Sequence, residues 1–137
     1  KASNFNITRA ENLLRIICGA FMFPHAMSKF ASFGVLSAGT IGFFGKAGFQ
    51  PPELWVWLAF FTESACGIAL VLGLCTRYAA LGAAGALAIA VYALHTVKGF
   101  GWLWNTGGYE YPIFWGLACV TVALWEFRRV YGPSGQR

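Results

Sequence analysis

The chain has 137 residues, of which 58% are hydrophobic and only 11% are charged. This length suits one domain. Soluble domains carry roughly one quarter charged residues, so the composition excludes a soluble enzyme and indicates a membrane protein. The net charge of +5 does not indicate a nucleic-acid partner, because the basic residues are scattered singly around apolar segments and form no basic stripe.

Four apolar segments are predicted to span a membrane. They cover residues 13–30, 54–74, 79–97 and 111–127. About twenty helical residues cross the hydrocarbon core of a bilayer, and an open sheet would leave its backbone groups unpaired in lipid. The predicted fold is therefore all-α: a single-domain, four-helix transmembrane bundle of an integral membrane protein, in contact with the lipid bilayer.

The first apolar segment contains Pro24 in its outer third. Proline removes a backbone hydrogen bond from a helix, so a kink or turn is predicted just before His25. No small-residue cleavage site is recognisable near the end of this segment, and we expect it to be retained as a helix.

The basic residues are divided unequally between the two predicted membrane sides. An even number of spans places both termini, together with the turn between the second and third spans, on one side. That side carries Lys1, Arg9, Arg15, Arg77, Arg128, Arg129 and Arg137, whereas the other carries Lys29, Lys46 and Lys98. Cytoplasmic loops are enriched in Lys and Arg. We therefore expect a multi-pass protein of the bacterial inner membrane with cytoplasmic termini.

Small residues recur every four positions in two of the predicted spans. They are Ala65, Ala69 and Gly73 in the second span, and Gly82, Ala86 and Ala90 in the third. Such ridges allow helix backbones to approach closely in lipid, so these faces are predicted to be packing faces.

Two further predictions concern residues outside or at the ends of the spans. Helical spacing predicts ion pairs between Glu11 and Arg15 and between Glu126 and Arg129. Residues 41–44, Ile-Gly-Phe-Phe, are predicted to form a short interfacial helix or a re-entrant segment.

Glu63 is the only ionisable side chain between Glu53 and Arg77, and it lies near the middle of the second span. A carboxylate at that depth costs several kcal/mol unless it faces protein, water or a partner. Glu63 is therefore a candidate functional residue. The structural alternative is a protonated acid that is hydrogen-bonded to a neighbouring helix.

Other ionisable and phenolic residues are predicted to share the outer half of the bilayer with Glu63. These residues are His25, Lys29, Tyr92, His95, Tyr109, Glu110 and Tyr111. The inner half has no intramembrane equivalent. The charged and imidazole side chains also have structural explanations: Lys29 would reach the interface, His25 would make a structural hydrogen bond, and His95 and Glu110 would be ordinary interfacial residues.

Several motifs resemble those of the DoxX family of small bacterial four-span membrane proteins. They include Arg15-Ile16-Ile17-Cys18-Gly19, His25-Ala26-Met27-Ser28-Lys29-Phe30, Leu72-Gly73-Leu74-Cys75-Thr76-Arg77 and Gly107-Gly108-Tyr109-Glu110-Tyr111-Pro112. The resemblance implies a four-helix transmembrane bundle. It also implies a redox setting, since some relatives are subunits of a thiosulfate:quinone oxidoreductase and others occur in oxidative-stress membrane complexes.

One functional hypothesis is a subunit of a quinone-linked oxidoreductase, with quinone as its possible cofactor. The catalytic candidates are then Glu63, His25 and His95. The substrate-binding candidates are Lys29, Tyr92, Glu110, Tyr109 and Tyr111. A quinone requires an apolar site, hydrogen-bond partners for its two carbonyl groups, and proton carriers. Other membrane subunits would supply the electrons, and whether this chain is itself an enzyme stays open.

The alternative is a non-catalytic accessory subunit of a larger respiratory or photosynthetic membrane assembly. The polar cluster would then fix the register of the helices. Two weaker hypotheses remain. One is a b-type haem held by His25 and His95, or a metal held by these histidines together with Glu63 and Glu110. The other is a transporter of a small solute or of protons. No metal site is assigned.

Overall fold

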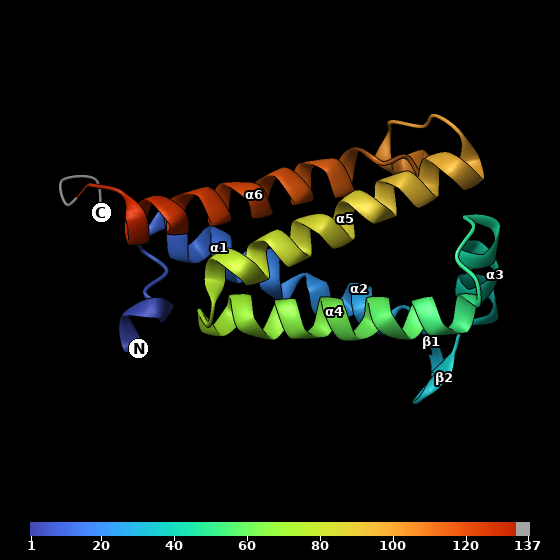
Figure 1. Ribbon diagram of the computed structural model, residues 1–137, viewed down its shortest axis with the longest axis horizontal. Helices are drawn as coiled ribbons and strands as arrows, with labels where there is room; N and C mark the ends of the chain where they lie inside the picture. Colours follow the sequence, from blue (N-terminus) through green and yellow to red (C-terminus); the bar gives the residue numbers. More distant parts are fainter. Residues whose placement is uncertain (134–137) are drawn as a thin grey trace.

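The computed structural model describes residues 1–133 and is mainly helical. Long helical stretches run side by side along the molecule (Figure 1). In chain order the α-helices are α1 (Ala10–Ala20), α2 (Met22–Met27), α3 (Ala38–Lys46), α4 (Pro52–Leu72), α5 (Thr76–Lys98) and α6 (Glu110–Tyr131). A small hairpin of β1 (Phe30–Ser32) and β2 (Val35–Leu36) precedes α3, and single 3-10 turns cover Ala2–Phe5 and Trp104–Thr106.

The first predicted span, 13–30, differs most from the structure. It is divided into α1 and α2 at Phe21, and the helix ends at Met27, before the β1 strand. The prediction of a break just before His25 was therefore wrong by about one turn. Pro24 has no N–H to donate to the carbonyl of Ala20, so the helical hydrogen bonds are interrupted a turn ahead of the proline.

The other three spans were predicted within a few residues of α4, α5 and α6. Helix α4 begins with Pro52 in its first turn and ends at Leu72, and the next residue, Gly73, has a left-handed φ of 77°. Proline is suited to a helix start and glycine to this end conformation. The predicted interfacial segment 41–44 lies within α3, so its helical form is confirmed.

Among residues 1–133, α4 and α5 are long and apolar enough to cross a membrane. Only 22% of the most apolar window of each helix is buried inside the protein. An apolar helix in the core of a soluble protein would be mostly buried, because its apolar side chains would need to avoid water. The outward-facing apolar surface indicates that this is a membrane protein.

The helices pack through small residues, and the faces that the sequence indicated take part only partly. Helix α5 packs along α6 with Ala79, Ala80 and Ala83 buried. Helix α1 meets α4 at Gly19 and Gly67, which are also buried. The predicted packing faces were therefore correct only in part. Ala69 packs against the core, and an added Cβ at Gly82 would lie 2.9 Å from Sγ of Cys66 on α4. In contrast, Ala65 is exposed, and Ala86 and Ala90 line a cavity. A repeat of small residues every four positions indicates a flat helix face, but it does not indicate which helix packs against that face.

One of the two predicted ion pairs is present. Arg129 pairs with Glu126, as expected. Glu11 pairs with Arg9 at 2.7 Å, so the predicted pair with Arg15 was wrong. Arg15 is buried instead, and its Nη1 donates at 2.6 Å to the carbonyl oxygen of Leu70. The last carbonyl groups of a helix lack hydrogen-bond donors within the helix. Arg15 of α1 therefore supplies a donor to the C-terminal carbonyl groups of α4.

We predict that Gly19→Ala destabilises the protein. A Cβ at this position would lie 2.7 Å from Leu70 Cβ and 2.8 Å from the carbonyl oxygen of Gly67. Helices α1 and α4 would have to separate, and overpacking of this kind costs about 1–3 kcal/mol. The midpoint of thermal unfolding in detergent, followed by circular dichroism, should therefore fall.

The matched control is Gly42→Ala in α3, where an added Cβ has no heavy atom within 4 Å. Its unfolding midpoint should stay unchanged or rise slightly, since alanine favours helix. Equal midpoints for the two variants would show that α1 and α4 do not pack through Gly19.

Candidate functional site

A cavity of about 500 Å³ lies between α4 and α5. The two helices are joined by a tight turn at one end and diverge toward the other, where α3 lies beside their ends (Figure 1). The α5 wall is made mainly of small residues, which leave space between the two helices. They are Gly82, Gly85, Ala86, Ala90 and Ala93.

A buried ion pair lies on one wall of the cavity. Lys29, just after α2, places its Nζ 2.6 Å from Oε1 of Glu63 on α4. Each residue is only 6% exposed. Moving either charge out of water alone would cost several kcal/mol, so the two charges need each other. The pair therefore fixes the position of α2 against the middle of α4.

His25 contacts the other oxygen of the same carboxylate. Its Nε2 lies 3.6 Å from Oε2 of Glu63, which is ion-pair range but longer than a hydrogen bond. The edge of the imidazole also meets the Trp115 ring, with the centroids 5.7 Å apart. Trp115 Nε1 in turn donates at 3.2 Å to the carbonyl oxygen of Cys18. Trp115 on α6 thus holds His25 beside the carboxylate.

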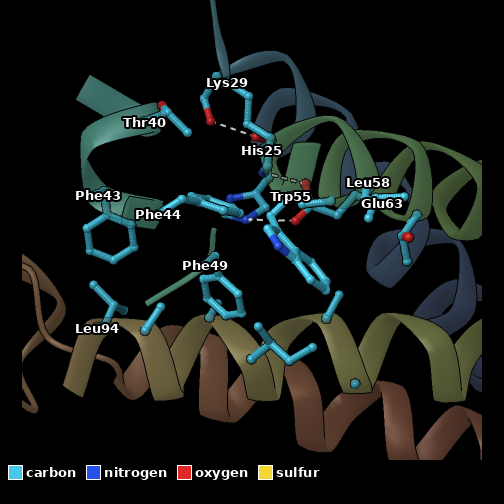
Figure 2. A pocket seen from close by; sticks show the side chains of 18 of the residues that line it. His25, Lys29, Thr40, Phe43, Phe44, Phe49, Trp55, Leu58, Glu63 and Leu94 are labelled. Atoms are coloured by element: carbon cyan, nitrogen blue, oxygen red, sulfur yellow. Dashed lines mark hydrogen bonds and ion pairs between the residues drawn. The ribbon is translucent and has the colours of Figure 1, made fainter. Parts of the chain in front are cut away.

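Aromatic side chains enclose the outer end of the cavity. Phe43 and Phe44 come from α3, Phe49 from the loop after it, and Trp55 from the first turns of α4. Neighbouring rings are in contact: the ring centroids of Phe44 and Phe49 lie 5.7 Å apart, and those of Phe49 and Trp55 lie 5.6 Å apart. Figure 2 shows these rings facing the same space as His25 and Glu63, with α5 opposite. The site therefore combines a polar wall with an aromatic end.

The structure brings together some of the predicted site residues. His25, Lys29, Glu63 and Tyr111 all line the cavity. They come from α2 and the residues after it, α4 and α6. The expectation that groups from separate helices meet around Glu63 is therefore met for these four residues.

The other four predicted site residues do not line this cavity. Tyr92 is 59% exposed on the outside of α5. His95 Nδ1 lies 3.3 Å from the hydroxyl group of Tyr109. Glu110 Oε1 accepts a 2.7 Å hydrogen bond from the backbone N–H of Trp104. His95, Tyr109 and Glu110 therefore order the loop between α5 and α6, because their contacts involve the segment that connects the two helices.

Sequence reasoning missed most of the cavity walls. Phe43 and Phe44 belong to a segment that was predicted to be helical, but nothing indicated that it faces Glu63. Gly85 was not singled out either, although an added Cβ there would enter open space. The available signal was the small-residue surface of the third span, which was interpreted as a packing face.

The described residues contain no group of three or more His, Cys, Asp or Glu side chains that could hold a metal ion. His25 lines the cavity and His95 does not, so the two histidines do not share this site. What the site offers chemically is one carboxylate, one ammonium group and one imidazole in an apolar chamber.

The comparison with known proteins identifies one family. No curated protein and no solved structure matches the chain. A sequence model of the DoxX family matches residues 11–96, which is more than half of the chain and includes His25, Lys29 and Glu63. This agrees with the resemblance in the sequence motifs and with the outward-facing apolar helices: the chain belongs to the DoxX family of membrane proteins.

Proposed function

We propose that this protein is a subunit of a membrane redox complex and binds a quinone in the cavity between α4 and α5. One observation carries the proposal: a buried Lys29–Glu63 pair, with His25 beside it, lies on the wall of an apolar chamber of about 500 Å³. Ligand sites typically combine a few polar groups with mainly apolar walls.

The polar wall suits the oxygen atoms of a quinone ring. Lys29 has three N–H donors and uses one for Glu63, which leaves donors for a carbonyl oxygen of the ligand. His25 offers a second ring nitrogen for the same purpose. Glu63 and His25 are also groups that accept and release protons, which the reduction of a quinone to a quinol requires.

The remaining walls suit an uncharged, lipid-soluble ligand. Lys29 and Glu63 neutralise each other, so an ionic ligand would bring an uncompensated charge into an apolar space. The rings of Phe43, Phe44 and Trp55 can stack with a planar ring. The chain itself would position the quinone and transfer its protons, and an associated protein would supply the electrons.

The proposal includes a membrane arrangement. The α1–α2 stretch, α4, α5 and α6 would cross the bacterial inner membrane as a four-helix bundle, with cytoplasmic termini. Two observations support it: the apolar surfaces of α4 and α5, and the concentration of basic residues at the end that holds the N-terminal turn and the last turns of α6.

The same ion pair also supports a second candidate, an accessory subunit without chemistry of its own. A dry Lys29–Glu63 pair would be sufficient to fix the register of α2 and α4. The hairpin between β1 and β2 adds a further observation, because Phe33 at its tip is 99% exposed. An exposed aromatic residue on a projecting hairpin suits contact with another subunit.

We predict that variants of the ion pair distinguish these two functions. Lys29→Met and Glu63→Gln should each lower the free energy of unfolding by about 3–5 kcal/mol, because each leaves one buried charge without its partner. The double variant should recover most of that loss, because neither charge is left unpaired. Quinone binding should nevertheless stay lost in the double variant, as measured by quenching of tryptophan fluorescence with a short-chain quinone.

The control for this experiment is Lys98→Gln, which removes an exposed charge at the end of α5. It should affect neither stability nor binding. If the double variant is stable and binds the quinone as tightly as the original protein, the pair has a structural role and the accessory function is preferred.

We further predict that Gly85→Leu abolishes quinone binding while the protein stays folded. The leucine would extend into the cavity, since an added Cβ at Gly85 meets no heavy atom within 4 Å. Binding should fall by at least tenfold in the same fluorescence titration. Gly42→Leu makes the identical change at a second open position outside the cavity lining, and it should bind normally. Unchanged binding by Gly85→Leu would place the ligand elsewhere.

A further inference from the structure

The net charge of the described chain is concentrated at one end of the bundle. This end contains the N-terminal turn, the turn between α4 and α5, and the C-terminal turns of α6 (Figure 1). Its charged residues are Lys1, Arg9, Glu11, Arg15, Arg77, Glu126, Arg128 and Arg129. At the opposite end and around the cavity, three lysines are balanced by three glutamates, namely Lys29, Lys46, Lys98, Glu53, Glu63 and Glu110.

Both acidic residues at the basic end are already paired. Glu11 pairs with Arg9 and Glu126 pairs with Arg129. Arg15 is buried against carbonyl groups of α4. Arg77 is therefore left without a carboxylate partner among residues 1–133.

Arg77 is held between two tyrosine rings. Its Cζ lies 4.9 Å from the ring centroid of Tyr78 and 5.4 Å from that of Tyr131, within the range of a cation–π contact. The two rings come from the start of α5 and the end of α6, so the guanidinium group joins both helices. Stacking of this kind fixes the plane of the group and leaves its edge available for hydrogen bonds.

Part of the edge of this guanidinium has no partner within the described protein, although side-chain hydrogen bonds also join Arg77 to Tyr78 and Tyr131. Arg77 Nε is buried and has no hydrogen-bond partner among residues 1–133. Arg129 lies close enough for its positive charge to act on Arg77. Two neighbouring guanidinium groups repel each other, and an anion placed between or beside them would relieve that repulsion.

We propose that Arg77, together with Tyr78, Tyr131 and the adjacent Arg129, forms a binding site for the phosphate of an anionic phospholipid headgroup. A guanidinium group matches the geometry of phosphate oxygens and donates to two of them at once. Tyrosine rings lie preferentially at the level of the headgroups, with the ring in the apolar region and the hydroxyl group in the polar region. The site is at the opposite end of the bundle from the aromatic end of the cavity and does not depend on the ligand of that cavity.

The geometry favours a membrane lipid over a dissolved phosphate. Tyr78 and Tyr131 are 57% and 65% exposed, so their rings present apolar surface around the basic group. Acyl chains of a lipid would cover that surface, whereas inorganic phosphate would leave it in contact with water. Basic residues beside a membrane surface are also the usual means of binding anionic lipid.

The test uses the full chain in detergent, and native mass spectrometry counts the phosphatidylglycerol molecules that stay bound. Arg77→Gln should bind phosphatidylglycerol roughly fivefold more weakly, which is the effect of one basic side chain near an anionic surface. Lys98→Gln, the same change at the other end of α5, should bind like the original protein. Phosphatidylcholine, with no net charge, should bind all three proteins weakly and equally.

Two further variants separate a defined site from diffuse attraction. Arg77→Lys keeps the charge but loses the planar group, and Tyr131→Leu removes one ring from beside it. Both should weaken phosphatidylglycerol binding. The proposal is overturned if Arg77→Lys and Tyr131→Leu bind normally, if Lys98→Gln loses as much binding as Arg77→Gln, or if inorganic phosphate competes as well as the lipid does. Circular dichroism checks the folding of each variant.

Discussion

The position of the N-terminal helices depends on the contact between Lys29 and Glu63. Two charges that are each 6% exposed face one another across the boundary between α2 and α4. Because neither charge can be buried alone without a cost of several kcal/mol, the end of α2 has only one position along α4 at which both are satisfied. His25 follows from that position, since it precedes Lys29 by one helical turn and meets the same carboxylate.

The cavity exists because the opposite helix does not fill the space beside this pair. On α5 the residues that face α4 at this level are mostly glycine and alanine, while Ala80, Ala83 and Leu87 lie in the core cluster with residues of α6. The small residues of α5 therefore have two effects. They allow close packing against α6, and they leave open space between α5 and α4. Helix α3 completes the chamber by bringing Phe43 and Phe44 to its outer end. The result is a polar wall and an apolar space at the same depth, which is the arrangement that the proposed ligand needs.

The sequence was sufficient to predict the helices but not their faces. Hydropathy and length predicted three long helices within a few residues of α4, α5 and α6, because a chain in lipid would pair its backbone groups within long helices. The special status of Glu63 was also predictable from its isolation in an apolar segment. Its partners were partly predictable, since Lys29 and His25 precede it on a neighbouring helix, whereas His95 and Tyr109 pair with each other. Which face of α5 meets α4 depends on the rotation of the helix, and a repeat of small residues carries no information about that rotation.

The short turn at Gly73 and Cys75, where both residues have positive φ angles, sets the angle at which α4 and α5 leave one another. Helices α4 and α5 are each about 30 Å long and diverge from this turn, so a difference of angle at the turn is amplified at their far ends. One degree of difference between the two helix axes corresponds to about 0.5 Å at the far end. The width of the chamber at its aromatic end, and so the bulk of the ring that it accepts, is therefore set by a few backbone angles in a turn that lies at the other end of the helices.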